Sequence, residues 1–256
     1  MGSPTATPVV DVVILTWNDG ALLGTAIESV LRSESVITNV VVVDNGSADP
    51  AGVSDLVTLI RLEENRGVAA GRNIGIRSGS ASLVCVLDSD AELGPWSLWN
   101  LCEELTRTAA AVAVPCFVDQ KPTASAGAAP TLGDKVRRVM GKTNEYRPQG
   151  SHPNGSSWAV DFGIGACQLF RREVYEEVGG IDESFFYGPE DVDFCLRIKR
   201  AGHDVVQVSG LEVLHPPRRI HRKPITRRGL AQAWAVTRYY SRHRGWIMAQ
   251  TKDAGR

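Results

Sequence analysis

Three carboxylates, Glu190, Asp191 and Asp193, lie within four residues of one another. The Gly-Pro pair directly before them is typical of a helix start, where the helix dipole stabilises anions. On that ground alone, all three acids are explained as the solvated first turn of a helix. A carboxylate that instead faces a cleft, partly removed from water, is a candidate general base.

A helical wheel separates the three acids. Because successive residues are rotated by about 100°, Asp191 lies in the middle of the apolar face, within roughly 40° of Cys195. Asp193 lies on the far side, where it can pair with Arg197 one turn later. We therefore predict that Asp191 is a candidate general base and that Glu190 lies at the rim. Asp193 is predicted to be solvated and paired with arginine.

A second acidic motif, Asp88 and Asp90, follows an apolar run that is typical of a strand. Around a turn, both carboxylates can bind a hard divalent cation such as Mn²⁺ or Mg²⁺, which prefers oxygen ligands and keeps positions open for phosphates. Two carboxylates alone make a weak site, which suits a metal bound jointly with a diphosphate. His215, at the end of LEVLH, can supply a third ligand. Ordinary packing is the alternative for this histidine.

Polar residues also follow two other predicted strands. Thr16, Trp17 and Asn18 end the first strand, and Asp44 ends the second. Turn chemistry explains any one such cluster, since turns use Asn, Asp, Gly and Ser. Ligands, however, bind beyond the carboxyl ends of the strands in a doubly wound sheet. Three clusters at one edge, counting Asp88, therefore predict a ligand site.

The segment from Glu64 to Gly79 is unusual because four polar residues, Asn65, Arg66, Arg72 and Asn73, surround a predicted helix that starts at glycine. An arginine here can reach a phosphate. The alternative is an amphipathic helix with exposed arginines. Neither a Walker-type loop nor G-x-G-x-x-G occurs in the sequence, which counts against a kinase, an NTPase or a dinucleotide-dependent enzyme.

Strands and helices alternate at short spacing in the first half of the chain. Strands are predicted at 9–16, 39–44, 56–62, 82–88 and 109–117, with helices at 68–78 and 95–108 among the connections. The continuous β-branched runs are typical of strands buried on both faces of a parallel sheet. This order predicts a three-layer α/β domain with right-handed crossovers.

The expected organisation is a flexible N-terminus, one catalytic domain and a basic helical extension. These span 1–8, 9–215 and 216–256, and the domain divides into a first half (9–118), a flexible loop (119–157) and a second half (158–215). The loop is rich in Gly, Ala, Ser, Thr and Pro. A stretch this long with little regular pattern is either disordered or a functional lid or binding loop.

Composition indicates an ordinary globular chain, with 43% hydrophobic and 22% charged residues among 256. The net charge of −1 does not favour nucleic-acid binding. Five scattered cysteines without a C-x-x-C spacing argue against a disulfide framework or a zinc site and favour a reducing cytoplasm. No signal-peptide pattern or membrane-spanning run is present in the sequence. We therefore expect a cytoplasmic protein, with peripheral contact at the inner membrane face left open.

Nine Lys or Arg residues and no carboxylate lie between Arg218 and Arg244. This stretch predicts a basic amphipathic helix, with Leu230, Trp234 and Thr237 along one stripe. Three partners remain open for it: an anionic membrane surface, a second copy of the chain in a homodimer, or the body of the domain.

In this order the motifs resemble the family 2 glycosyltransferases of the GT-A fold, particularly the bacterial rhamnosyltransferase-like branch. The similarity covers 9–215 and rests on VVILTWN, VVVDNGSAD, ENRGVAAGRNIGI, LDSD, GACQLFRREVYEEVGGIDESFFYGPEDVDFCLRIKRAGH and VLH. It implies a three-layer α/β/α fold with a mixed, mostly parallel central sheet and a Rossmann-like nucleotide-binding half. In such a domain, 9–118 would be the nucleotide-sugar donor half and 158–215 the acceptor and catalytic half.

The resemblance implies an inverting, metal-dependent transfer from a nucleotide-diphosphate sugar, with UDP- or dTDP-sugars favoured. By similarity, Thr16 and Asp44 would hydrogen-bond the pyrimidine, and Trp17 would stack on it in place of the usual tyrosine. The other implied donor-binding residues are Asn18, Asn65, Gly67, Arg72 and Asn73. Asp90 would ligate the metal, with Asp88 beside it near the ribose and sugar of the donor, and His215 would complete the metal site. Asp191 would be the base within the catalytic pair Glu190 and Asp191.

The resemblance implies a hydroxyl-bearing acceptor, which can be a glycan, a lipid-linked intermediate or a natural product. Because 119–157 carries no recognisable acceptor signature, all three classes stay open. Two other functions stay open. A sugar nucleotidyltransferase would normally have a lysine-containing phosphate loop near the first strand, which TWNDGALLG lacks. A non-catalytic nucleotide-sugar-binding protein would not need the acids, which are all present.

Overall fold

The structure is a computed structural model that describes residues 6–118, 120–121, 124–131, 133–134, 137, 155–216 and 234–243. The expectations for the start of the N-terminus, the remainder of the 119–157 loop and the rest of the basic extension lie outside these residues. None of the described helices is both long and apolar enough to cross a bilayer.

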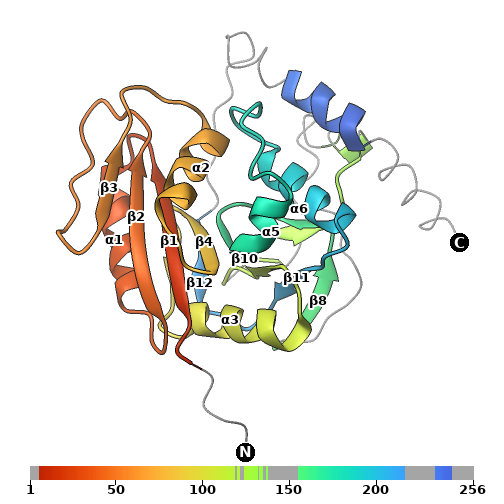
Figure 1. Cartoon of the computed structure of the whole chain (residues 1–256), viewed down its shortest axis with the longest axis horizontal. Coiled ribbons are helices and arrows are strands. Elements are labelled where there is room, and N and C mark those ends of the chain that lie inside the picture. The colour runs from red at the N-terminus through yellow and green to blue at the C-terminus, as the bar shows by residue number, and fades with distance from the viewer. Residues whose placement is uncertain are drawn as a thin grey trace, which may run out of the picture.

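One eight-stranded sheet forms the centre of the molecule, in the order β3-β2-β1-β4-β10-β6-β11-β8 (Figure 1). Its strands are β1 (Val9–Thr16), β2 (Ile37–Asp44), β3 (Thr58–Arg61), β4 (Leu83–Asp88), β6 (Val112–Pro115), β8 (Ser157–Val160), β10 (Cys167–Arg171) and β11 (Val205–Val208). The first four pair in parallel, as β6 does with β11, whereas β10 and β8 run antiparallel to their neighbours. The predicted mixed, mostly parallel sheet is confirmed.

Helices cover both faces of this sheet. They are α1 (Gly20–Leu31), α2 (Val68–Ser78), α3 (Ser97–Thr108), α5 (Arg172–Glu177) and α6 (Glu190–Arg200), followed by a helical segment at 234–243. The core on one face contains residues of α1 and α3, and the core on the other contains residues of α2, α5, α6 and the 234–243 segment. The molecule therefore has the three layers expected from its alternating elements.

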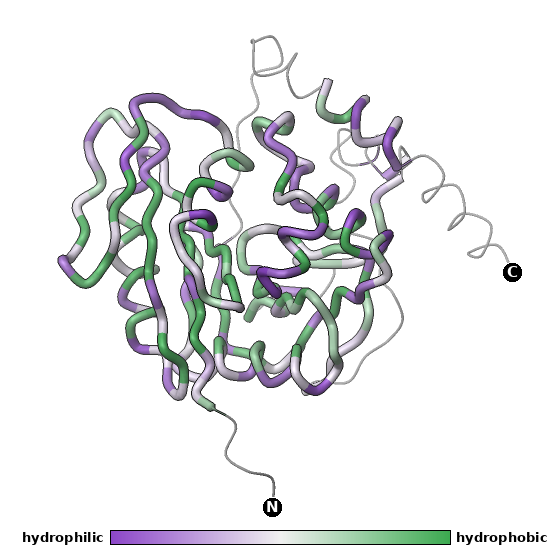
Figure 2. Tube along the Cα trace, viewed as in Figure 1, coloured by the Kyte–Doolittle hydropathy of each residue, from purple (hydrophilic) through white to green (hydrophobic). Residues whose placement is uncertain are grey.

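The alternation within β1 shows why this run of apolar residues forms a central strand. Val12 and Ile14 belong to the core on the α1 side, while Val13 belongs to the core on the α2 side. Successive side chains of a strand point to opposite faces, so a strand covered on both faces must be apolar throughout. Figure 2 shows the central strands as long hydrophobic runs of the trace.

Two short ladders complete the described architecture. Strand β5 (Glu92–Leu93) pairs with β12 (Val213–Leu214), and β7 (Ala126–Gly127) pairs with β9 (Phe162–Gly163). Each has only two residues per strand, and neither was expected as a pair from the sequence. The β5–β12 ladder brings the chain at 213–215 back to the residues that follow β4.

Candidate active site

The parallel register of the sheet gathers the predicted polar residues at one edge. Thr16 is the register partner of Asp44 in β2, and Leu15 is the partner of Asp88 in β4. Since the carboxyl ends of parallel strands meet at the same edge, Thr16, Asp44 and Asp88 lie on one side of the sheet. The juxtaposition expected from the sequence is present.

Asp88, Asp90 and His215 form a group that can hold a metal ion. One ligand atom from each lies within 4.8 Å of the others. His215 Nε2 is 3.6 Å from Asp90 Oδ1 and 3.9 Å from Asp88 Oδ2. The β5–β12 pairing places His215 here, and the ring of Phe117 packs against the imidazole at 5.0 Å between centroids. Two carboxylates and one imidazole fit Mn²⁺ or Mg²⁺ with positions left for a diphosphate.

Arg72 joins this metal-ligand group to the acid pair of α6. Its side chain is 5% exposed, and its Nη2 donates to Asp88 Oδ1 at 2.8 Å and to the carbonyl of Gly165 at 2.7 Å. Its Nη1 lies 3.5 Å from Glu190 Oε1. Burial lowers the pKa of Arg72, but the neighbouring charges of Asp88, Glu190 and Asp191 outweigh burial and raise it. The guanidinium therefore carries a fixed positive charge between two groups of acids.

Glu190 is buried, so its predicted position at the rim is wrong. It is 5% exposed and faces Arg72 instead of solvent. Burial, followed by the negative charge of Asp191, raises the pKa of Glu190 to about 7, against the opposing effect of Arg72. The helical wheel predicted the wrong exposure for Glu190, because it contains no information about contacts with other helices, such as the one with Arg72 of α2.

Asp191 is half-buried and turned toward the residues that precede β10. Its Oδ2 accepts a hydrogen bond from the Gly165 amide at 3.0 Å, and its Oδ1 accepts one from the Val192 amide at 2.8 Å. Burial raises the pKa of Asp191, while the Gly165 amide and Arg72 act in the opposite direction. This carboxylate is held in a fixed orientation, and its affinity for a proton is increased.

Gly165 was missed in the sequence, although its backbone contacts both charged groups. Its carbonyl accepts from Arg72 and its amide donates to Asp191. A Cβ at this position would lie 2.1 Å from Arg72 Nη1. The glycine pair in FGIGA was the available signal, since glycine in a strand region often marks a close approach.

Asp193 is fully buried, so its predicted solvation is wrong, whereas its pairing with Arg197 is confirmed. The Arg197 Nε to Asp193 Oδ2 distance is 2.8 Å, and the Asp193 side chain is 0% exposed. The far side of α6 is covered by the helical segment 234–243, which supplies Arg242 and His243 to the same carboxylate. Helical periodicity could not reveal a contact made by a distant segment.

The carboxyl ends of β1 and β2 lie beside the metal-ligand group. We call their residues, Thr16, Trp17, Asn18 and Asp44, the shelf. Trp17 is 37% exposed, while Thr16 is buried and its Oγ1 has no hydrogen-bond partner among the described residues. Asn18 Oδ1 accepts from the Ala48 amide at 2.9 Å, which ties the two strand ends together.

Asp44 is fully buried at this shelf. Its two oxygens accept from the amides of Ser47 at 2.9 Å and Ala51 at 3.1 Å. Burial raises the pKa of Asp44, but its hydrogen bonds to Ser47 and Ala51 and the charge of Arg61 outweigh this and lower it. Asp44 therefore remains ionised and shapes the loop after β2.

The start of α2 is fixed to the loop that leads into α6. Asn65 Oδ1 accepts from the Gly67 amide at 2.9 Å. Gly67 has φ +88°, and a Cβ there would lie 2.7 Å from the carbonyl oxygen of Phe186. That carbonyl accepts from the Val68 amide at 2.8 Å. Glycine at 67 thus permits the close approach of the α2 start to the Phe186 backbone. This contact brings Glu190 and Asp191 toward the carboxyl ends of β1, β2 and β4.

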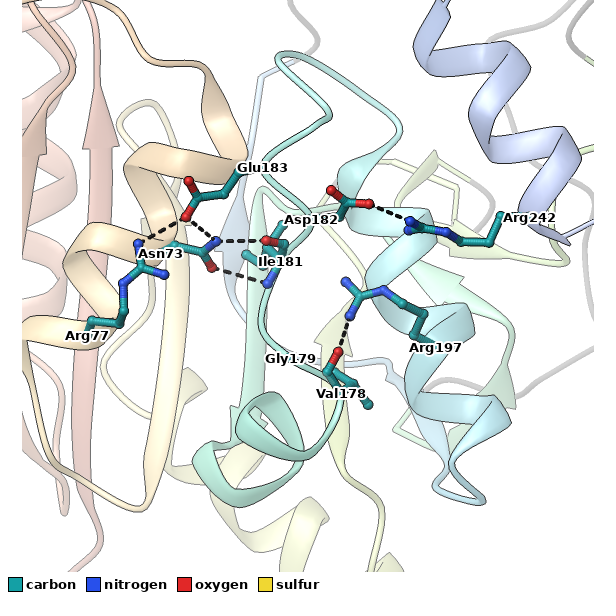
Figure 3. Close-up of a pocket in the computed structure, with 9 residues that line it drawn as sticks. All are labelled: Asn73, Arg77, Val178, Gly179, Ile181, Asp182, Glu183, Arg197 and Arg242. Carbon is teal, nitrogen blue, oxygen red and sulfur yellow. Dashed lines mark hydrogen bonds and ion pairs between the residues drawn. The ribbon is translucent and has the colours of Figure 1, made fainter.

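Asn73 supports the same loop from α2, and the structure does not place it with the other predicted donor residues. Its Nδ2 donates to the Ile181 carbonyl and to Glu183, and its Oδ1 accepts from Tyr175 Oη and the Ile181 amide, at 2.7 to 3.1 Å. Asn73, Ile181 and Glu183 line a cavity of about 410 Å³ between α2 and α6 (Figure 3). All four hydrogen-bonding positions of Asn73 are therefore used within the fold.

The buried ionisation of Glu190 gives a pH-dependent stability prediction. A carboxyl whose pKa folding raises from 4.5 to about 7 destabilises the native state as the pH rises from about 4.5 to about 7, because over that range the unfolded chain loses the proton that the native state keeps. We therefore expect the stability of Glu190→Gln relative to the wild type to increase between pH 5 and pH 7 and to stay constant from there to pH 8.5. Melting temperatures measured across this range without metal or nucleotide test this. A difference between the two proteins that is independent of pH would contradict it.

The chain was compared with known proteins. Residues 11–179 match the model of Glycosyl transferase family 2. The N-acetylglucosaminyl-diphospho-decaprenol L-rhamnosyltransferase of Mycobacterium tuberculosis is 30% identical over 236 residues, covering 82% of this chain and 76% of that protein. The dTDP-rhamnosyl transferase RfbF of Shigella flexneri is 27% identical over 210 residues, covering 79% of this chain and 67% of that protein.

Among solved structures, that of GalNAc-T7 with UDP, GalNAc and Mn²⁺ aligns with a TM-score of 0.65 at 17% identity, over 86% of this chain and 46% of that one. At this identity the likeness shows the fold alone, which is the expected GT-A fold. The family match covers more than half of the chain, and the relatives named above are glycosyltransferases. This chain therefore belongs to glycosyl transferase family 2 and is a glycosyltransferase.

Proposed function

We propose that this enzyme transfers a sugar from a nucleotide-diphosphate donor to an acceptor hydroxyl with inversion, and that Asp191 is the general base. The observation that carries the proposal is the position of Arg72. It contacts Asp88 at 2.8 Å and Glu190 at 3.5 Å, so the metal-ligand group and the acid pair belong to one site.

In the proposed reaction, Asp191 accepts the proton of the acceptor hydroxyl while the hydroxyl oxygen attacks the anomeric carbon. The bond from that carbon to the diphosphate oxygen breaks, and the nucleoside diphosphate leaves with the electron pair. Asp88, Asp90 and His215 would hold Mn²⁺ or Mg²⁺, which supplies positive charge for the departing diphosphate when bound. The Gly165 amide keeps Asp191 in one orientation during the proton transfer.

The donor would lie along the carboxyl edge of β1, β2 and β4. Trp17 is exposed enough to stack on a pyrimidine, and Thr16 has a buried hydroxyl without a hydrogen-bond partner among the described residues. Asn18, Asp44, Asn65 and Gly67 would shape this edge. Because two relatives are named as rhamnosyltransferases, one of them for a dTDP-rhamnosyl group, a dTDP-linked deoxyhexose is the first donor to test.

The same relatives guide the proposed acceptor. One is named for an N-acetylglucosaminyl-diphospho-decaprenol substrate. A glycan or lipid-linked sugar with a free hydroxyl is therefore the acceptor class that we propose.

A panel of nucleotide sugars tests the function. We expect slow, Mn²⁺- or Mg²⁺-dependent release of nucleoside diphosphate from a dTDP- or UDP-sugar, with GDP-sugars as the control. The anomeric configuration of the sugar product, followed by NMR, distinguishes inversion from retention. Release of sugar phosphate would instead indicate nucleotidyl chemistry, and binding without any turnover would contradict catalysis.

Trp17→Ala gives a narrower test of the donor edge. Loss of one stacking surface should weaken nucleotide binding by roughly 1–3 kcal/mol, about 5- to 150-fold. We expect a higher KM for the donor with little change in kcat. Trp96→Ala is the matched control, because Trp96 is 49% exposed and precedes α3. Equal effects of the two substitutions would remove Trp17 from the donor site.

A further inference from the structure

We propose that the helical segment 234–243 is part of the catalytic machinery, in which Arg242 and His243 are positioning residues for Asp191. They act through Asp193 and through the loop from Asp182 to Glu190. This inference rests on the proposed role of Asp191 as the base.

Asp193 connects the segment to the first turns of α6. Its Oδ1 accepts from Arg242 Nη1 and His243 Nε2, each at 2.8 Å, and its Oδ2 accepts from Arg197 Nε at 2.8 Å. Burial raises the pKa of Asp193, but these three partners outweigh burial and lower it. A buried ionised carboxylate two residues after Asp191 is thus satisfied mainly by a distant part of the chain.

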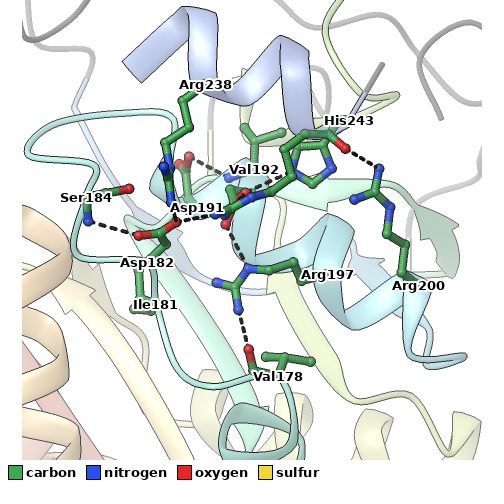
Figure 4. A network of polar contacts seen from close by, with 12 residues as sticks. Val178, Ile181, Asp182, Ser184, Asp191, Val192, Arg197, Arg200, Arg238 and His243 are labelled. Atoms are coloured by element: carbon green, nitrogen blue, oxygen red, sulfur yellow. Dashed lines mark hydrogen bonds and ion pairs between the residues drawn. The ribbon is translucent and has the colours of Figure 1, made fainter. Parts of the chain in front are cut away.

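Arg242 also holds the other end of the loop that presents the acid pair. Its Nη2 lies 2.7 Å from Asp182 Oδ2, so one guanidinium bridges Asp182 and Asp193. Arg238 adds a second contact to Asp182 at 3.3 Å. Figure 4 shows Arg238 and His243 on the segment above Asp182, Asp191 and Arg197. The backbone from 183 to 192, which carries Asp191, is therefore closed at both ends by the same side chain.

His243 is fitted to this task as a buried hydrogen-bond donor. It is 0% exposed, and it packs on the Tyr239 ring at 5.1 Å between centroids. Because the ionised Asp193 can only accept, Nε2 carries the hydrogen of this bond. The imidazole therefore holds the Asp193 carboxylate from the side of segment 234–243.

The packing of the segment agrees with this role. Ala235 and Tyr239 are buried in the same core as α6, whereas Trp234 is 53% exposed. The predicted stripe through Trp234 and Thr237 therefore lies on the solvent side, and the interpretation as a contact with the domain body holds for 234–243. The apolar contacts alone would attach the segment, and the ionic contacts add a defined orientation for the loop.

The test separates positioning from simple stabilisation. Arg242→Lys keeps the charge but lacks the planar fork that bridges two carboxylates, and His243→Phe keeps the ring but removes the donor. We expect both variants to lose turnover on the order of 10²-fold, as small misplacements of a catalytic group do. Their Mn²⁺-dependent affinity for dTDP or UDP should stay within about twofold of wild type, because a loss confined to kcat is the mark of an interaction used in the transition state.

Hydrogen–deuterium exchange provides a readout that does not depend on activity. In both variants, exchange should increase across 183–192 and stay unchanged in β1 and β4. Arg200→Ala is the matched control, since Arg200 donates to the Arg242 carbonyl at 3.1 Å from an exposed position and does not bridge the loop. Its turnover and exchange should equal those of the wild type.

Wild-type turnover and exchange in Arg242→Lys and His243→Phe would overturn the proposal. A loss of nucleotide affinity together with raised exchange throughout the sheet would also overturn it. That result would mean that the segment stabilises the whole fold and does not specifically position Asp191. If the wild type transferred no sugar from any donor, the proposed function would fail. Exchange across 183–192 would still decide whether the segment orders the loop.

Discussion

Asp191→Asn should lower the rate of sugar transfer on the order of 10²–10⁴-fold, the usual contribution of a general base. Asparagine has the same shape and can still accept the Gly165 amide hydrogen bond, which is 3.0 Å long in the wild type. It cannot take a proton from the acceptor. Because Asp191 lies apart from the β1 and β2 shelf, nucleotide affinity should hardly change.

Two measurements make this result specific. Single-turnover transfer with bound donor reports the chemical step, and calorimetry with dTDP or UDP and Mn²⁺ reports donor binding. Asp55→Asn removes an exposed carboxylate near β3 and should leave both values unchanged. Wild-type turnover in Asp191→Asn would end the assignment of Asp191 as the base.

The same substitution also has an electrostatic consequence at Glu190. The charge of Asp191 is one cause of the raised pKa of Glu190. Its removal should lower the pKa of Glu190, so the melting temperature of Asp191→Asn should vary less with pH near 7 than that of the wild type.

Asp90→Ala should abolish the increase in donor affinity that Mn²⁺ or Mg²⁺ provides. Asp90 is almost fully buried and lies 3.6 Å from His215, so few other groups can replace its oxygen. Asp90 is a better choice than Asp88, because Asp88 also pairs with Arg72 at 2.8 Å. Loss of Asp88 would leave a buried arginine without one of its partners and would mix two effects.

Calorimetric titrations with dTDP or UDP, with and without Mn²⁺, measure this directly. The wild type should bind more tightly with the metal, and Asp90→Ala should bind equally in both conditions. A wild type that is indifferent to metal would exclude the metal site. A variant that keeps the full metal effect would exclude Asp90 as a ligand.

Much of the fold could be predicted because its signals are local. The β-branched run of β1 and the glycine-started helix at 68–78 were found with correct boundaries. The D-x-D motif at the end of β4 was also accessible, since it depends on a strand end. The helical wheel ranked the three acids wrongly, because Glu190 and Asp193 are more deeply buried than Asp191.

The remaining parts of the site depend on long-range contacts. His215 reaches Asp88 and Asp90 through the β5–β12 ladder, whose two-residue strands leave no periodic pattern. Arg72 was expected to hold the nucleotide, and in the structure it lies between carboxylates of β4 and α6. Asp193 was misplaced because its partners Arg242 and His243 come from a segment that no local rule connects to α6.

On the proposed roles, the residues that bind the donor and the metal and the residues that position the base lie in different parts of the chain, and the segment 234–243 belongs to the second group. Every residue proposed for the donor and the metal lies before 216 in the chain. A chain that lacked 234–243 would therefore keep every residue proposed for the donor and the metal, while Asp193 would lose two of its three partners. On the proposed roles, such a chain would bind nucleotide sugar and transfer it only slowly.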